Sequence, residues 1–498
     1  MNDEYRADVA AILNESIPAE QFAFVSQSEC SRNEQHTAAP PRSYARDVLA
    51  RFATDRGSVA AGIIISLLIL YALIAPFVSP YTVSDKDGYY AFATPKNRLL
   101  GSGGFWDGTY KTTVNEQTYD YYCNIPGAIQ KLYGTEERTV AGRTRTWYTV
   151  RIDSYAKVGW VKMLLTHAEY RAARAWEAET GTQLFYPLID QSKITNPAYE
   201  DDQNAWFLTD ERGVALRDSH DAVTAIFLRD ETSADGYAYT ALRMNGQQQE
   251  ARVLYTVWYR YVHGHDAHFL FGADGSGYDI FTRLAFGARL SFVLSICVAA
   301  VNLILGTVIG ALEGYYGGTF DLVMERIKDI LYDVPFVVCM TLFQIYCAQK
   351  AGPIVSMFFA FVFFGWISTS STVRAQMYRF KGQEYVLAAR TLGARDSRLI
   401  FKHILPNAIG FIITTSVLTI PGIIFSEANL TYLGIVNLQT DTMTSIGTML
   451  NNGQLTLAEH PHAVFFPAAF ISLLLICFNE FGNGLRDAFN PQLRGASA

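Results

Sequence analysis

A basic segment between two apolar runs holds the residues whose types and spacing are most informative about chemistry. Over 384–409, five cationic side chains outnumber two acids: Arg390, Arg395, Arg398, Lys402 and His403 against Glu384 and Asp396. Ala388, Ala389 and Gly393 lie among them with almost no side chain, so a partner surface can approach while the arginines pair with its carboxylates. These residues predict a docking element. The alternative is a generic inner loop that is basic only because of membrane topology.

Two short helices joined at a glycine are expected to position these residues. Good helix formers precede Gly393, which we expect to cap the first helix. Asp396 is expected to cap a second helix running to His403, and Pro406 to end that helix and begin the turn into the next apolar run. Both helices are expected to lie parallel to the membrane surface, within one loop over 374–408.

An acidic side chain inside an apolar run is a second candidate. A carboxylate at the middle of a bilayer costs roughly 2.5–3.5 kcal/mol, so Glu427 should face a cavity or a partner. Two interpretations stay open: a residue lining a translocation path, or a carboxylate near the outer end that is hydrogen-bonded to neighbouring helices. No metal site is predicted, because the chain has no Cys/His metal spacing and its DGSGYD stretch (274–279) lacks the order of a calcium loop.

Six apolar runs are long enough to cross a bilayer, which needs about 20 mostly apolar residues. They are expected at 57–79, 291–314, 322–348, 353–373, 409–434 and 463–485. Arginines precede the first run, so the positive-inside rule places the N-terminus, the loop 374–408 and the C-terminus in the cytoplasm. Gly306, Gly310 and Gly314 share one helix face, which another helix can approach closely.

A long polar segment separates the first two runs and is expected to be extracytoplasmic, with an inserted α+β domain over about 102–267. Strands are expected at 146–156 and 251–262, and a helix over 166–181 that ends at Gly181. We expect this insert to dock a binding protein or to shield the mouth of a channel. The whole chain then divides into a cytoplasmic tail 1–56, a first helix 57–80, an extracytoplasmic segment 81–285, a five-helix core 286–485 and a cytoplasmic end 486–498.

The basic segment closely resembles the EAA loop of ABC importer permeases of the oligopeptide and dipeptide branch. Ala388 and Ala389 stand at the two alanine positions, and Gly393 follows after three residues. Leu405 and Pro406 close the motif at the expected spacing. The resemblance extends over about 268–495 and the first apolar run.

Several positions depart from the family pattern. Leu387 stands where the first glutamate is expected, although Glu384 supplies an acid three places earlier, as is common in this branch. His403 replaces an isoleucine, and Tyr278 replaces the usual arginine before the second apolar run. The Pro-x-x-Trp-Gly pattern expected near 440–447 is absent, and TSIG stands there.

The resemblance implies an all-α polytopic membrane protein with six transmembrane helices of the type I ABC importer kind, plus the inserted domain. It implies that the loop seats in a groove of a cytoplasmic ATPase subunit through Glu384, Ala388, Ala389, Arg390, Gly393, Leu405 and Pro406. The partners it implies are a second homologous permease, two ATP-binding cassette ATPases, an extracytoplasmic peptide-binding protein and membrane lipid, with no nucleic acid.

A P-loop requires the dipeptide Gly-Lys, which does not occur in the chain, so ATP and Mg²⁺ are expected on partner subunits and no cofactor or catalytic residue on this one. The implied function is translocation of oligopeptides or dipeptides across the bacterial cytoplasmic membrane. The alternatives are import of another small solute, such as nickel or a modified peptide, and a membrane-anchored receptor or sensor.

Overall fold

The computed structural model describes residues 44–97, 101, 104, 106–140, 143–220, 222–243 and 246–489. The chain divides into two compact units, Met1–Arg56 and Gly57–Ala498. Within the first unit, the structure has the short helix α3 (Tyr44–Phe52). The rest of the predicted cytoplasmic tail, 1–43, and the last residues of the predicted cytoplasmic end, 490–498, lie outside the described residues.

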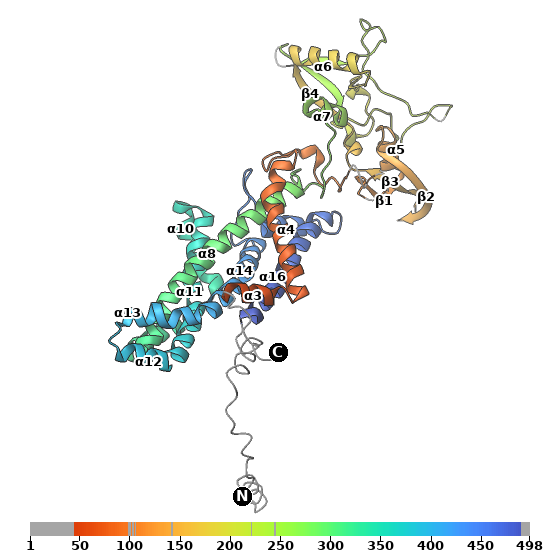
Figure 1. Cartoon of the computed structure of the whole chain (residues 1–498). Helices are drawn as coiled ribbons and strands as arrows, with labels where there is room; N and C mark the ends of the chain where they lie inside the picture. The colour runs from red at the N-terminus through yellow and green to blue at the C-terminus, as the bar shows by residue number, and fades with distance from the viewer. Residues whose placement is uncertain are drawn as a thin grey trace, which may run out of the picture. The chain divides into compact units, whose positions relative to one another are not determined.

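Five helices of the second unit are long and apolar enough to cross a membrane (Figure 1). They are α4 (Arg56–Val78), α8 (Ile280–Tyr316), α11 (Pro353–Phe380), α14 (Leu405–Tyr432) with the helical turns before it from Asp396, and α16 (His462–Phe489). A shorter helix, α15 (Ile446–Gln454), begins at Ser445, whose side chain accepts a hydrogen bond from the backbone N–H of Thr448. The five long helices, without α15, match five of the six predicted runs.

The run predicted over 322–348 is not one straight helix. It consists of α9 (Gly318–Asp333) and α10 (Phe336–Ala351), which are bent by 81° at the break between them. Proline disfavours the helical conformation of the residue before it, and Val334 before Pro335 is extended. Counted as one span, the pair gives six spans in the described part of the chain, and otherwise there are five.

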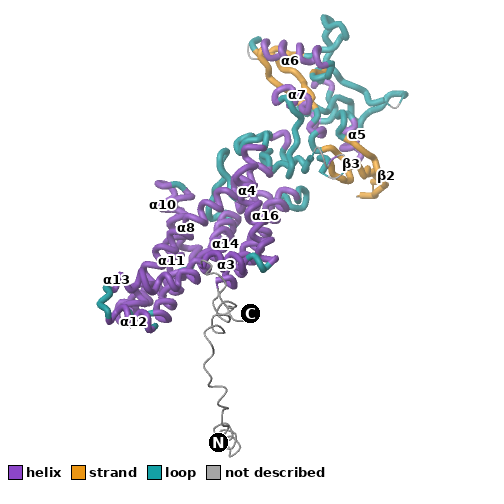
Figure 2. The backbone as a smooth tube through the Cα atoms, in the orientation of Figure 1, coloured by secondary structure: helices purple, strands orange, loops and turns teal. Residues whose placement is uncertain are grey.

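Strands occur between α4 and α8 in the sequence (orange in Figure 2). A three-stranded antiparallel sheet has the order β1-β3-β2, from β1 (Thr109–Asn115), β2 (Ile129–Val140) and β3 (Arg143–Asp153), with α5 (Glu116–Cys123) between β1 and β2. A second sheet has the order β4-β7-β5 with β6 beside β7, from β4 (Trp160–Thr166), β5 (Phe185–Tyr186), β6 (Thr240–Arg243) and β7 (Gln248–Leu254). Short 3₁₀ helices cover Gly88–Tyr90, Ala156–Val158, Gln191–Lys193 and Pro197–Tyr199.

The local predictions for this segment are confirmed in two places and wrong in a third. Of the strand expected over 146–156, residues 146–153 belong to β3, which ends at Asp153, and the expected helix is α6 (His167–Thr180), which ends at Gly181 in the left-handed conformation. The strand expected over 251–262 ends at Leu254, where its partner β4 begins with Trp160, and the chain continues as helix α7 (Tyr255–His263). The spacing of Tyr255 and Tyr259 suits a helix face equally well, and both rings are buried in one apolar cluster.

Candidate functional site

The first part of the basic segment is a short helix that ends at a glycine. Helix α12 (Glu384–Thr391) is followed by Gly393, whose φ of +80° is in the left-handed region. The N–H groups of Gly393 and Ala394 donate to the carbonyls of Arg390 and Ala389, at 3.0 and 3.1 Å. This pair of bonds is a Schellman motif, which glycine adopts without the strain a Cβ would cause. The glycine therefore sets the angle at which the chain leaves α12.

The second part of the segment differs from the predicted helix and turn. Asp396 is the first residue of α13 (Asp396–Arg398) and makes no N-terminal capping bond. A π-helical turn, η7 (Leu399–Ile404), then continues directly into α14, and the N–H of Leu405 donates to the carbonyl of Ile400. Pro406 begins this helix rather than ending the previous one. The wider turn suits a proline, which has no N–H for the regular bond.

Buried side chains anchor the segment to three long helices. One apolar cluster joins the basic segment to α8, α11 and α14: Ala311, Tyr315, Val373, Met377, Val386, Leu399, Ile400, Ile404, Leu405, Ala408 and Ile412. Between the anchors, the turn at Gly393 projects outward, and Leu392 is 88 % exposed. Leu392 therefore belongs to the accessible surface of the segment, and the buried residues on either side of it hold the turn in place.

The predicted docking residues fall into two groups. Leu405 is buried, and Ala389 is half-buried against the anchoring cluster. The others are exposed: Glu384, Ala388, Arg390, Gly393 and Pro406. The exposed residues are accessible to a partner, whereas Leu405 and Ala389 pack in or against the anchoring cluster.

One hydroxyl group bridges the two halves of the segment. Tyr315, at the end of α8, donates to the Asp396 carboxylate at 2.5 Å, and the Arg390 guanidinium donates to the same hydroxyl at 3.2 Å. The hydrogen bond to Tyr315 raises the pKa of Arg390. Arg390 and Asp396 lie on opposite sides of the Gly393 turn, so Tyr315 fixes both sides to one long helix. Sequence reasoning missed Tyr315, because nothing in its neighbourhood shows that α8 ends beside the loop.

Charged side chains also join α8, α9 and α11 to one another, close in sequence to Tyr315. Lys328 donates to the buried Glu313 carboxylate at 2.8 Å, and Ser370 donates to the same oxygen at 3.1 Å. Nearby, Arg374 donates to both oxygens of Asp321, at 2.5 and 2.8 Å. A broken buried pair is strongly destabilising, so these contacts hold the three helices in one arrangement. The acid inside the apolar run at 313 is the signal that could have found this network.

Close helix packing involves the same part of α8 and α11 as this network. A Cβ at Gly306 would lie 2.5 Å from the side chain of Thr369, and one at Gly314 would lie 2.5 Å from that of Met377. At Gly310 a Cβ would meet the Ser370 carbonyl oxygen well below 3.0 Å, closer than real Cβ atoms come. These glycines therefore let α8 lie directly against α11, whose last turns lead into the basic segment.

Glu427 lies in the interior of the helix bundle and is 1 % exposed. Ser291 of α8 donates to one carboxylate oxygen at 2.6 Å. Among the described residues, the other oxygen has no hydrogen-bond partner. Thr431, Ser445 and Thr448 form a buried hydroxyl chain nearby. The carboxylate therefore lies where α8, α14 and the start of α15 meet.

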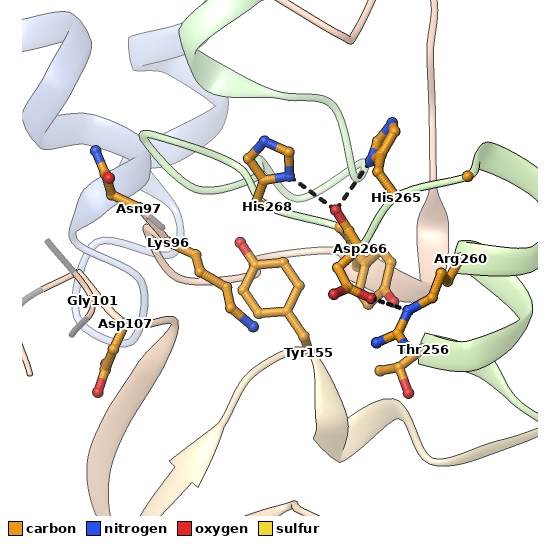
Figure 3. A pocket seen from close by; sticks show the side chains of 13 residues that line it. Lys96, Asn97, Gly101, Asp107, Tyr155, Thr256, Arg260, His265, Asp266 and His268 are labelled. Carbon is orange, nitrogen blue, oxygen red and sulfur yellow. Dashed lines mark hydrogen bonds and ion pairs between the residues drawn. The ribbon is translucent and has the colours of Figure 1, made fainter. Parts of the chain in front are cut away.

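A cavity of about 700 Å³ lies beside the end of α7 (Figure 3). Arg260 donates to the Asp266 carboxylate at 2.6 Å, and ring nitrogens of His265 and His268 lie 3.0 and 2.9 Å from the Asp266 carbonyl oxygen (Figure 3). On the opposite wall, Lys96 lies over the Tyr155 ring. These charged groups are already partnered within the chain. Within the described residues, no group of three or more His, Cys, Asp or Glu side chains could hold a metal ion.

Comparison with protein families gives two matches. Residues 284–495 match the binding-protein-dependent transport system inner membrane component. Residues 43–95 match the N-terminal transmembrane domain of oligopeptide transport permease C. The long segment between the two matches contains all the strands of the described chain.

Curated proteins similar to this chain are peptide transport permeases. The oligopeptide transport system permease protein OppC of Bacillus subtilis (strain 168) is 43 % identical over 45 % of this chain and 72 % of its own length. The dipeptide transport system permease protein DppC of the same strain is 40 % identical over 45 % and 69 %. OppC of Haemophilus influenzae (strain ATCC 51907 / DSM 11121 / KW20 / Rd) is 35 % identical over 46 % and 72 %.

Solved structures with some similarity include the MetNI methionine ABC transporter in an inward-facing conformation. It is 14 % identical with a TM-score of 0.34, over 42 % of this chain and 96 % of that chain. An amino acid ABC transporter crystallised with histidines is 14 % identical with a TM-score of 0.33, over 40 % and 91 %.

Proposed function

The chain belongs to the oligopeptide and dipeptide permeases of ABC importers, and from this premise we propose that its segment 384–406 docks an ATPase subunit. The chain is the permease subunit of a peptide importer, a membrane protein rather than an enzyme. Its partners in this proposal are a second homologous permease, two ATPases that bind ATP and Mg²⁺, and an extracytoplasmic peptide-binding protein.

The observation that carries this proposal is the combination of an exposed tip with a rigid base. Leu392 and its small neighbours are free to contact a partner, whereas Val386, Leu399 and Ile404 are buried against the long helices. Tyr315 ties both sides of the Gly393 turn to α8. A force on the tip is therefore delivered to α8 and α11 instead of being absorbed by a flexible loop.

The membrane arrangement proposed is that of the sequence predictions. The loop over 374–408 and both termini face the cytoplasm, and the segment 81–285 with its inserted domain faces the exterior of the cytoplasmic membrane. The charges support this side assignment, because Arg374, Arg379 and Lys381 extend the basic segment toward α11. In this arrangement the buried charge network and the Tyr315 bridge lie at the cytoplasmic end of the bundle.

Glu427 has a separate place in the proposal. Its carboxylate lies among three helix segments that a change of bundle packing would separate, and its one partnered oxygen is bonded to α8 through Ser291. A change in the packing of these segments would expose the carboxylate. We propose that Glu427 lines the translocation path. The alternative is a carboxylate near the outer end of its helix that is only hydrogen-bonded to neighbouring helices, as it is to Ser291 of α8.

Peptide uptake tests the function directly. Cells that lack this chain are supplied with labelled dipeptides and longer peptides, with and without restoration of the chain. The proposal expects ATP-dependent uptake only after restoration. Restored uptake of Ni²⁺ with no restored uptake of any peptide would assign the chain to a different substrate, and restoration of neither would contradict an import function.

A further inference from the structure

One face of the three-stranded sheet carries cations at neighbouring positions on adjacent strands. Lys111 of β1 and Lys131 of β2 are the pairing partners of Arg151 of β3, so three basic residues lie abreast across the sheet. Farther along, Arg138 of β2 pairs with Arg145 of β3. We call the face formed by Lys111, Lys131, Arg138, Arg145 and Arg151 the cationic sheet face.

The opposite face is covered by the protein itself. The ring of Tyr119 on α5 stacks on that of Tyr148 at a centroid distance of 4.0 Å. Side chains alternate along a strand, so Tyr148 and Arg145 belong to opposite faces of β3. The sheet therefore has one face packed under α5, and the cationic sheet face is the one turned away from it.

Little within the chain neutralises the cationic sheet face. Arg151 pairs with Asp107 at 2.6 Å, and Arg138 pairs with the exposed Glu136 at 2.9 Å. In the described part of the chain, Lys111, Lys131 and Arg145 form no salt bridge. Like charges directly opposite each other on neighbouring strands destabilise a sheet. The sheet keeps three such pairings, and only one cation of each pairing has an acidic partner, which leaves excess positive charge suited to an anionic surface.

Aromatic rings interleave with these cations. The ammonium groups of Lys111 and Lys131 lie 4.8 and 5.3 Å from the centre of the exposed Tyr133 ring, which belongs to an irregular stretch of β2. The guanidinium of Arg138 lies 5.4 Å from the Trp147 ring. Tyrosine, tryptophan and arginine are enriched at protein interfaces, where rigid rings and planar cations lose little entropy on binding.

We propose that the cationic sheet face docks an acidic surface of the extracytoplasmic peptide-binding protein. This inference rests on the proposed function, which supplies that protein and places the insert on its side of the membrane. Complementary charge across an interface chiefly steers the encounter and raises the association rate, and the effect weakens as salt increases. The occupant is a folded protein rather than lipid because the cations alternate with aromatic rings, and arginine, tyrosine and tryptophan are the residue types enriched at protein interfaces.

The test uses the complete transporter in lipid nanodiscs and a purified peptide-binding protein chosen because it stimulates ATP hydrolysis by the wild-type transporter. The double variant Lys111→Glu with Lys131→Glu is compared with Arg171→Glu with Arg212→Glu, which makes the same charge change at exposed positions elsewhere in the insert. Association is followed at low and high salt. Intrinsic fluorescence of the insert checks that each variant is folded, and Lys111→Gln with Lys131→Gln serves if charge reversal prevents folding.

The expected result is association at least about tenfold slower in the Lys111 and Lys131 variant at low salt, with a weaker salt dependence, and wild-type rates in the control. Equal rates in both variants would overturn the inference. So would a variant that loses binding to phosphatidylglycerol vesicles while it binds the protein normally, because the occupant would then be lipid. A wild-type transporter that no binding protein stimulates and that imports no peptide would instead contradict the proposed function.

Discussion

Tyr315 is the residue through which the exposed tip of the basic segment is connected to the bundle. Its hydroxyl is both donor to Asp396 and acceptor from Arg390, on opposite sides of a glycine turn. Removal of the hydroxyl leaves the ring in its apolar cluster and changes only these bonds. Hydrogen bonds to charged groups contribute about 1.5–3 kcal/mol, which is enough to change how firmly the two helices are held.

We predict that Tyr315→Phe weakens the coupling of ATP hydrolysis to transport. Peptide uptake should fall by roughly three- to tenfold, while basal ATP hydrolysis by the assembled transporter stays near the wild-type rate. Uptake and hydrolysis are measured on the same proteoliposomes. Tyr316→Phe is the matched control, since Tyr316 is the next residue and is 59 % exposed. Equal uptake in both variants would show that the hydrogen bonds of Tyr315 do not contribute to coupling.

Asp279 gives a prediction about pH. Its carboxylate caps α8 by accepting from the N–H groups of Phe281 and Thr282, and burial raises its pKa to about 6. A raised pKa in the folded state means that the protonated form is the better accommodated one. Its contribution to stability is therefore complete below about pH 4, the value for the unfolded chain, and is lost as pH rises through about 6.

The measurement compares the wild type with Asp279→Asn, whose amide oxygen still caps the helix without a charge. The unfolding midpoint of the wild type, relative to that of the variant, should fall as pH rises from 4 to 7. Midpoints are followed by intrinsic fluorescence in detergent. Parallel midpoints over this range would contradict the assignment of the raised pKa to Asp279.

Among the helices, the close contact of α8 with α11 stabilises the bundle next to the basic segment. We predict that Gly310→Ala lowers the free energy of unfolding by about 1–3 kcal/mol, because the added Cβ must push away the backbone at Ser370. Gly422→Ala in α14 is the control, as a Cβ there has nothing within 4 Å. It should be neutral or stabilising by about 0.5–1 kcal/mol. Similar losses in both variants would argue against close packing as the reason for glycine.

Elements with strong local signals could be predicted from the sequence, and those decided by distant contacts could not. Helix α6 has a capping threonine and a terminal glycine, and both are used in the structure. The alternation of aromatic residues after Leu254 fits strand and helix alike, and the end of the neighbouring strand β4 decides for a helix. The apolar run over 322–348 was expected as one span, because its length and composition do not show that it is broken into α9 and α10 with a bend of 81°.

In the candidate site, too, features with a local sequence signal could be predicted and features set by distant contacts could not. The Gly393 turn could be predicted because glycine is the residue that takes a positive φ without strain. The continuous helix through Pro406 could not be predicted. Proline lacks the N–H that a regular helix needs, and the sequence does not show that a π-helical turn precedes it. The bridge by Tyr315 joins residues 81 positions apart, which no local pattern in the sequence indicates.

In the whole molecule, we propose that the insert docks the peptide-binding protein, whereas the membrane bundle docks the ATPase through the basic segment. We predict that deletion of residues 110–262 abolishes the stimulation of ATP hydrolysis by the peptide-binding protein and leaves basal hydrolysis in place. The reason is that the basic segment and its anchoring cluster lie outside the deleted part. Hydrolysis is measured with and without the binding protein.

The deletion also removes Tyr155, Tyr255 and Tyr259 from the apolar cluster they share with Tyr90 and Phe269, so the unfolding midpoint should fall. Assembly with the partner subunits, checked by size-exclusion chromatography, separates this loss from a docking defect. Stimulation that persists in an assembled deletion variant would show that the binding protein docks elsewhere.

Cross-linking can test directly whether the tip at Leu392 contacts an ATPase subunit. A photoreactive side chain is placed at 392 and, as control, at 455, where the leucine is 86 % exposed and outside the basic segment. We expect a cross-link from 392 to the ATPase that strengthens or weakens with bound nucleotide, and none from 455. Absence of any ATPase product from 392 in an active transporter, or equal products from both positions, would contradict it.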